Sequence, residues 1–150
     1  MTSPDPANRR IMGIDFGSVR IGLAVGDPLG ILAHPRGAWK NNDSFWTQLS
    51  ELVKTEGISL VVVGMPLNLK GQKGKKAEEV DEFVSRLKRE TGLEVITWDE
   101  RFTTSIAKRT LIEMGTKKKD RRNKKHNVDA MAASLILQSF LDSTKKSLGC

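Results

Sequence analysis

The chain has 150 residues, 38% of them hydrophobic, which is long enough for one domain with a buried core and short for two. No stretch approaches the roughly 20 apolar residues of a membrane span, and residues 1–9 lack the apolar core of a signal peptide. The only cysteine, Cys150, excludes an intrachain disulfide and a cysteine-ligated metal site. We therefore expect a cytoplasmic protein that binds no membrane, with a disordered lead at residues 1–9.

Residues 10–26 predict two strands joined by a tight turn. A short apolar run ends at Asp15, Gly17 and Ser18 supply turn chemistry, and apolar residues then alternate with small ones. The glycines on either side of Asp15 leave the backbone bare, so an anionic ligand could come close. Two interpretations of Asp15 stay open here: a carboxylate that binds a divalent metal beside a phosphate, or an ordinary turn former.

The next segments predict an edge strand and a helix. Residues 31–39 can form a third strand, and Pro35 places it at a sheet edge because proline donates no ladder hydrogen bond. Residues 44–56 have helical spacing of apolar side chains, with Asp43 or Ser44 as the cap and a glycine as the stop.

The middle of the chain predicts two further strands around a second helix. Residues 58–64 are a continuous β-branched run, typical of a parallel strand buried on both faces. Residues 65–76 contain four lysines, and we expect them to form a mobile loop beside the substrate. An amphipathic helix over 77–90 and a strand over 93–98 follow.

The last third of the chain predicts two helices separated by a basic run. The first runs from Thr103 or Thr104 to about Met114. Residues 117–125 hold seven basic residues and one acid, a net charge of +6 that leaves the rest of the chain near neutral. Such a run indicates either phosphate contacts, which we favour, or a solvated loop. Asn127 is expected to cap a final apolar helix over 128–141, with residues 142–150 as a flexible tail.

The order of these elements predicts an α/β fold with one domain at residues 10–141. Right-handed crossovers give a five-stranded mixed sheet in the order 3-2-1-4-5, flanked by helices. The parallel strands place Asp15 and the pair Asp99 and Glu100 on the carboxyl edge, where open α/β sheets bind ligands. Asp129 joins them if the last helix begins there.

Carboxylates gathered without histidine or cysteine suit a hard cation, Mg²⁺ or Mn²⁺. Two such ions are what phosphodiester cleavage commonly uses, one to activate water and one to stabilise the leaving oxygen. Each acid also has a simpler interpretation. Asp99 could be a turn residue, Glu100 an ion-pair partner, and Asp129 a residue that favours the helix dipole.

Four motifs together resemble the YqgF/RuvX family. They are Gly13-Ile-Asp-Phe-Gly-Ser-Val-Arg-Ile-Gly-Leu-Ala24, Val63-Gly-Met-Pro-Leu-Asn68 with Gly71, Asp99-Glu-Arg-Phe-Thr-Thr104, and Val128-Asp-Ala-Met-Ala-Ala133 with Ile136-Leu-Gln138. The resemblance covers about residues 10–141, with every motif in order. It implies a ribonuclease-H-like fold and a metal-dependent nuclease of the cytoplasm, described either as a resolvase or as a nuclease for pre-16S ribosomal RNA.

The resemblance implies that Asp15, Glu100 and Asp129 are the catalytic and metal-binding acids. Asp99 is a fourth catalytic candidate, and whether Asp99 or Glu100 is the metal ligand stays open. Met65 and Phe102 stand where leucine is common in the family, which are apolar exchanges without consequence for the chemistry.

Polar residues elsewhere are candidates for nucleic-acid binding, through contacts that position a strand without specifying its sequence. These are Arg20, Asn68, Lys70, Arg101, Lys117, Lys118, Lys119, Arg121, Arg122, Lys124 and Lys125. His126 is expected to be structural or to face phosphate, with assistance to proton transfer as the alternative.

The leading hypothesis is hydrolysis of phosphodiester bonds at the 5′ end of pre-16S ribosomal RNA. The alternatives are resolution of Holliday junctions in branched DNA, a catalytically inactive nucleic-acid-binding module, and an ATP-binding protein of the actin and sugar-kinase kind. The last needs two such domains where 150 residues supply one. These residues do not distinguish endonuclease from exonuclease action, or an RNA from a DNA substrate. They also do not tell whether the ribosome is a partner, or whether the protein is a monomer or a homodimer.

Overall fold

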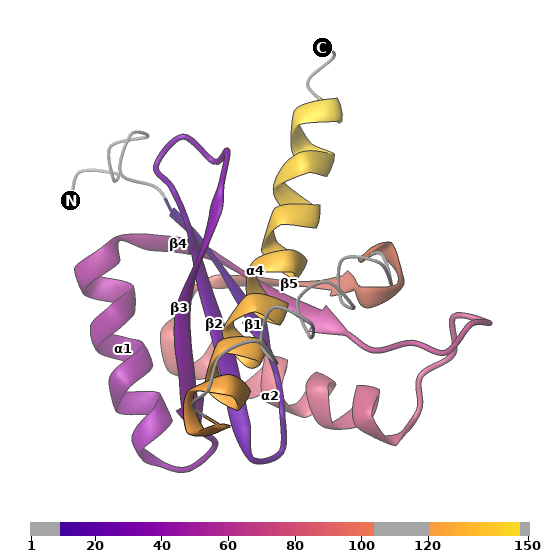
Figure 1. Cartoon of the computed structure of the whole chain (residues 1–150), viewed down its shortest axis with the longest axis horizontal. Helices are drawn as coiled ribbons and strands as arrows, with labels where there is room; N and C mark the ends of the chain where they lie inside the picture. The colour runs from indigo at the N-terminus through magenta and orange to yellow at the C-terminus, as the bar shows by residue number, and fades with distance from the viewer. Residues whose placement is uncertain (1–9, 104–120, 148–150) are drawn as a thin grey trace.

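The computed structural model describes residues 10–103 and 121–147, which form a mixed sheet covered by helices on both faces (Figure 1). The elements, in chain order, are β1 (Arg10–Asp15), β2 (Arg20–Gly26), β3 (Ala33–Lys40), α1 (Ser44–Glu56), β4 (Ile58–Met65), α2 (Lys75–Thr91), β5 (Glu94–Asp99), the short 3₁₀ helix η2 (Glu100–Phe102) and α4 (Arg121–Ser147). None of the described helices is both long and apolar enough to cross a membrane.

The strand order β3-β2-β1-β4-β5 confirms the predicted topology. β1 pairs antiparallel with β2 and parallel with β4, and β4 pairs parallel with β5. β4 is central because its apolar run is buried on both faces, as expected for a parallel strand. β3 lies at the edge, where Pro35 is tolerated opposite Ala24 beside an irregularity in the register.

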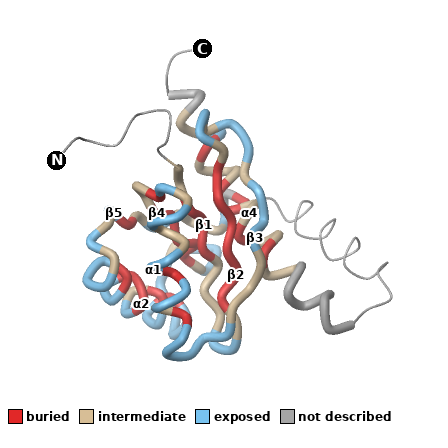
Figure 2. The backbone as a smooth tube through the Cα atoms, turned by 90° about the vertical axis from the view of Figure 1, so that its left-hand side faces the viewer, coloured by how far each residue is buried: buried red, intermediate tan, exposed pale blue. Residues whose placement is uncertain are grey.

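Two apolar clusters lie on opposite faces of the sheet. Figure 2 shows that the strands of the sheet carry long buried stretches. On one face the side chains of β1, β2 and β4 pack against α1 and α2, with Phe45, Leu49 and Leu87 fully buried. On the other face α4 packs with Ala133 and Leu137 against a smaller cluster. Because of these two clusters, β1 and β4 form the buried centre of the molecule. Their carboxyl ends therefore lie at a well-packed edge of the sheet.

Helix α4 lies directly on bare backbone. A Cβ atom added at Gly13 would stand 2.7 Å from the Cβ of Leu137, and one added at Gly22 would stand 2.1 Å from the backbone oxygen of Asp129. The space above these glycines, which we expected to admit an anionic ligand, is therefore filled by α4. Their missing side chains serve helix–sheet packing on this face.

Helix α4 differs most from its predicted bounds. It begins at Arg121 and ends at Ser147, so Asn127 is an interior residue and does not cap it. The basic residues 121–125 are helical because lysine and arginine are good helix formers and no proline or glycine interrupts them. Asp129 consequently lies well beyond the first turn, where the helix dipole no longer acts on it.

The other bounds differ by smaller amounts. α2 begins at Lys75, two residues before its predicted start, and β3 begins at Ala33. Gly57, the predicted stop of α1, and Gly92, which ends α2, both have positive φ angles of 68°. Asp43 makes no side-chain cap bond, and the side-chain Oδ1 atom of Asn42 instead accepts from the backbone N–H of Ser44 at 3.1 Å. The helix expected up to about Met114 lies outside the described residues.

Candidate functional site

Two acids meet at the carboxyl edge of the parallel strands. Asp15 is the last residue of β1, and Glu100 follows the last residue of β5. The Glu100 side chain lies close enough to Asp15 that its negative charge raises the pKa of the Asp15 carboxyl. Glu100 reaches this position over β4, where a Cβ at Gly64 would stand 2.9 Å from the Glu100 Oε1 atom. The glycine in β4 therefore leaves room for the Glu100 side chain.

The pKa of Asp15 reports how tightly the acids are gathered. Burial, which is the largest cause, and the negative charge of Glu100 together raise the pKa of this carboxyl from 3.8 to about 7. The Lys76 ammonium opposes this rise, and the charge of Asp129 adds to it. The Asp15 pKa thus places Glu100, Asp129 and Lys76 within electrostatic reach of one carboxyl group.

The raised pKa predicts that Asp15→Asn stabilises the metal-free protein at alkaline pH. Between about pH 4 and 7 the folded protein keeps a proton on Asp15 that the unfolded chain releases, so stability falls as pH rises through this window. Asparagine removes that penalty. We expect a gain in unfolding free energy of up to about 4 kcal/mol at pH 8 and little at pH 4.

Urea denaturation of wild type and Asp15→Asn at both pH values, in EDTA, measures this difference. The matched control is Asp43→Asn, because Asp43 is exposed and its side chain makes no cap bond. The prediction is wrong if Asp15→Asn changes stability equally at both pH values.

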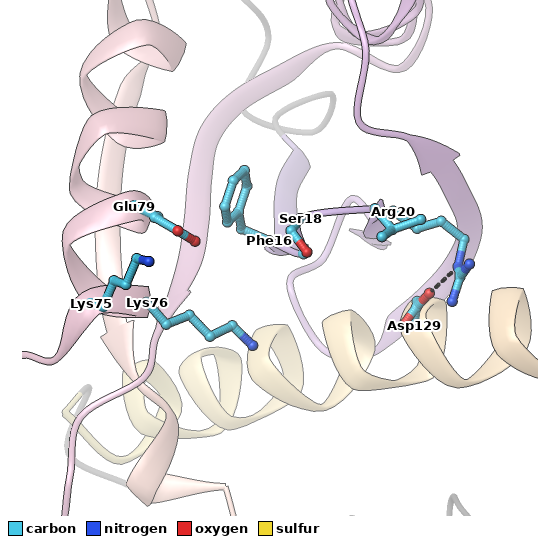
Figure 3. A pocket seen from close by; sticks show the side chains of 9 residues that line it. Phe16, Ser18, Arg20, Lys75, Lys76, Glu79 and Asp129 are labelled. Carbon is cyan, nitrogen blue, oxygen red and sulfur yellow. Dashed lines mark hydrogen bonds and ion pairs between the residues drawn. The ribbon is translucent and has the colours of Figure 1, made fainter.

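Asp129 approaches the two acids from α4. Its backbone oxygen lies over Gly22, and Gly22 is the residue of β2 paired with Asp15. The side chain of Asp129 forms an ion pair with Arg20, with Nε 2.9 Å from Oδ2. The packing of α4 on β2 therefore determines where the backbone of Asp129 lies above the sheet. The ion pair with Arg20 determines the direction in which its carboxylate points (Figure 3).

The donor set fits a hard divalent cation in part. Asp15 and Glu100 supply only carboxylate oxygens, which Mg²⁺ and Mn²⁺ prefer, and a cation would relieve the repulsion that raises the Asp15 pKa. In the part of the chain that the structure describes, no group of three acidic, histidine or cysteine side chains is arranged to hold an ion. The carboxylate of Asp129, the third candidate acid, is paired with Arg20.

Asp99 points to different partners from Glu100. Both of its carboxylate oxygens accept from the Arg101 side chain, at 2.6–3.1 Å, and Oδ1 also accepts from the Arg101 backbone N–H. The Arg101 side chain holds the pKa of Asp99 below its usual value. Asp99 is therefore neutralised by its neighbour, whereas Glu100 turns toward Asp15.

The loop between β4 and α2 has an internal hydrogen-bond network around Asn68. Its Oδ1 atom accepts from the backbone N–H groups of Lys70 and Gln72, both at 2.9 Å, and its Nδ2 atom donates to Gln72. Arg101 donates to the backbone oxygen of Leu69 at 3.4 Å. Asn68 and Arg101 thus shape this loop, which leaves Lys70, exposed near the tip, as the candidate there for substrate contact.

A hollow of about 570 Å³ opens beside Asp129 (Figure 3). It lies between the β1–β2 turn, the first turn of α2 and α4. Besides Arg20 and Asp129, its lining includes Ser18, Lys75, Lys76 and Glu79. Sequence reasoning did not single out these two lysines, although a lysine pair directly after Gly74, at the start of a helix, is a signal that could have found them.

The remaining candidates are only partly described. Lys117, Lys118 and Lys119 lie outside the described residues. Arg121, Arg122, Lys124, Lys125 and His126 lie in α4, and only their backbone is described. Thr103 is buried, and its hydroxyl has no hydrogen-bond partner among the residues that the structure describes.

Comparison with known proteins gives one family and a consistent set of relatives. Residues 9–143 match the family model RuvX, described as a Holliday junction resolvase. A protein of Sulfurihydrogenibium sp. named "Putative pre-16S rRNA nuclease" is 44% identical over 135 residues, which cover 89% of this chain and 90% of the relative. A protein of Acetivibrio thermocellus with the same name is 44% identical over 143 residues, covering 93% and 99%.

Solved structures show the same fold at lower identity. RuvC of Thermus thermophilus in complex with a Holliday junction substrate superposes with a TM-score of 0.57 at 17% identity, covering 91% of this chain and 96% of that one. A second structure of that RuvC has a TM-score of 0.55 at 16% identity, covering 90% and 96%. The ribonuclease-H-like fold of these resolvases is thereby the fold of this chain.

Proposed function

The chain belongs to the RuvX family, and from this premise we propose that it is a metal-dependent nuclease that hydrolyses phosphodiester bonds. The observation that carries the proposal is the contact between Asp15 and Glu100 at the carboxyl edge of the sheet, with Asp129 beside them. Clustered acids of this kind have little structural value, since like charges in a partly buried site oppose folding. Clustered acids are, however, suited to holding a cation against a phosphate.

The proposed role of the acids is to hold a divalent cation and to orient it toward the phosphate. A divalent cation, or a pair of them, would stabilise charge on the phosphate and lower the pKa of the attacking water. Asp15 and Glu100 would hold it with carboxylate oxygens once Asp15 is ionised. Asp129 would complete the set when its carboxylate turns from Arg20, and the freed Arg20 guanidinium is then available to a phosphate oxygen.

The proposed substrate is the 5′ end of pre-16S ribosomal RNA. Support comes from the relatives of that name, which match almost their whole length at 44% identity. This role would place the protein in the cytoplasm and in contact with the assembling ribosome. The second candidate is resolution of Holliday junctions, which the description of the family model favours, and which would suit a homodimer because the junction is symmetric.

The test is cleavage of two substrates side by side: a 5′-extended 16S precursor RNA and a synthetic four-way DNA junction. Each is incubated with Mg²⁺, Mn²⁺ or EDTA. We expect cutting of the RNA that needs a divalent ion and stops in EDTA. Symmetric cutting of the junction alone would assign the protein to junction resolution, and binding of both without cutting would leave an inactive binding module.

A further inference from the structure

Two hollows meet over the turn between β1 and β2. The first is the hollow of about 570 Å³ beside Asp129. The second, of about 350 Å³, lies between the same turn and the residues that link β3 to α1. Both are lined by Ser18, Val19 and Arg20, so they adjoin along this turn, and we call the two together the turn groove.

Lysines stand at both ends of the turn groove. Lys75 and Lys76 line one end and Lys40 the other. Figure 3 shows the Lys76 side chain reaching from α2 toward α4. Within the described residues none of these three ammonium groups forms an ion pair, whereas Lys73 nearby is paired with Asp81 at 2.9 Å.

The acids of the turn groove do not cancel this positive charge. Asp129 is already paired with Arg20, which leaves Glu79 as the other carboxylate in the lining. Three lysines therefore outnumber one free acid. The groove is a positively charged surface that passes directly beside the catalytic acids.

The floor of the turn groove is rigid. The backbone N–H of Asn41 donates to the oxygen of Val19, and its side chain donates to the oxygen of Gly17, both at 2.9 Å. These bonds tie the link before α1 to the β1–β2 turn. On this floor Val19 presents an apolar side chain that is 67% exposed.

We propose that the turn groove holds one strand of nucleic acid, with Lys75 and Lys76 on phosphates next to the acids and Lys40 on phosphates further along. A sugar–phosphate strand carries a charge at every nucleotide, which matches lysines spaced along the two adjoining hollows. The exposed Val19 then packs against a sugar or base. This inference rests on the proposed function, and it assigns the path that the substrate takes across the site.

The test measures binding without cleavage, in EDTA. The probes are fluorescein-labelled single strands of RNA and of DNA, roughly 12 nucleotides long. Affinity is followed from about 50 to 200 mM KCl, because each lost phosphate contact reduces the slope of log affinity against log salt by about 0.7 for a single strand. The double variant Lys40→Gln/Lys76→Gln removes two contacts, so the magnitude of its slope should be smaller by about 1.4. It should also bind at least tenfold more weakly than wild type at low salt.

The matched control is Lys54→Gln/Lys88→Gln. It removes the same charge from exposed lysines in the last turns of α1 and α2, and the α2 position is 12 residues, about 18 Å, from Lys76. Its slope should equal that of wild type. An equal loss in both double variants, or an unchanged slope in Lys40→Gln/Lys76→Gln, would overturn the proposed path.

These outcomes separate the turn groove from the nuclease. If Lys40→Gln/Lys76→Gln reduces the salt slope and the wild-type protein cuts neither substrate, the turn groove binds a strand and the proposed nuclease activity is wrong. If the wild-type protein cuts in a metal-dependent manner and the variant has an unchanged salt slope, the nuclease proposal stands and the proposed strand path is wrong. A loss seen with the RNA probe alone supports the groove and identifies the strand that it holds.

Discussion

Glu100→Gln is expected to lower the rate of metal-dependent cleavage by about 10³-fold or more, whereas Asp99→Asn should cost no more than about tenfold. Glutamine keeps the size of Glu100 but removes the charge that faces Asp15 and would bind the cation. Asp99 faces Arg101, so its loss loosens the contact of Arg101 with the loop after β4 and leaves the acids in place. Adjacent residues of the chain thus have opposite roles.

Single-turnover cleavage and calorimetric titration with Mn²⁺ measure the two variants together. Glu100→Gln should lose both cleavage and metal affinity, while its midpoint of thermal unfolding stays near or above that of wild type because a like charge beside Asp15 is gone. Asp99→Asn should retain metal affinity. Loss of metal affinity in Asp99→Asn with a functional Glu100→Gln would reverse the assignment.

Gly22→Ala is expected to destabilise the fold and to reduce cleavage together. The added Cβ would stand 2.1 Å from the backbone oxygen of Asp129, and a helix backbone cannot rotate out of the way. Helix α4 must lift from β2, which weakens the packing of the second apolar cluster and moves Asp129 away from Asp15. We expect a loss of about 1–3 kcal/mol in unfolding free energy, or more, and a fall in cleavage of at least tenfold.

The matched control is Gly26→Ala, on the same strand and facing the same helix. Its added Cβ would stand 3.4 Å from the backbone oxygen of Ile11 and 3.7 Å from Leu141, which are ordinary contacts. Urea denaturation should place this variant within about 1 kcal/mol of wild type, with unchanged cleavage. If the two variants behave alike, the close approach of α4 at Gly22 does not determine the position of Asp129.

The sequence by itself determined the sheet. The β-branched run of β4 is typical of a strand buried on both faces, Pro35 assigns β3 to an edge, and the handedness of crossovers then predicts the observed strand order. The placement of Asp15 and of the pair Asp99 and Glu100 on one edge followed from this order, because parallel strands end on the same edge. These features depend on local patterns and on rules of connection that hold for any chain.

The tertiary structure alone decided how the site is completed. The start of α4 was not predicted, because a run of like charges also indicates a solvated loop, although lysine and arginine are good helix formers. Asp99 and Glu100 are neighbours in sequence, and their partners depend on where β5 ends and on the bare backbone of Gly64. The pairing of Arg20 with Asp129 joins residues 109 positions apart. Local preference carries no information about such contacts, since they form only when α4 packs on β2.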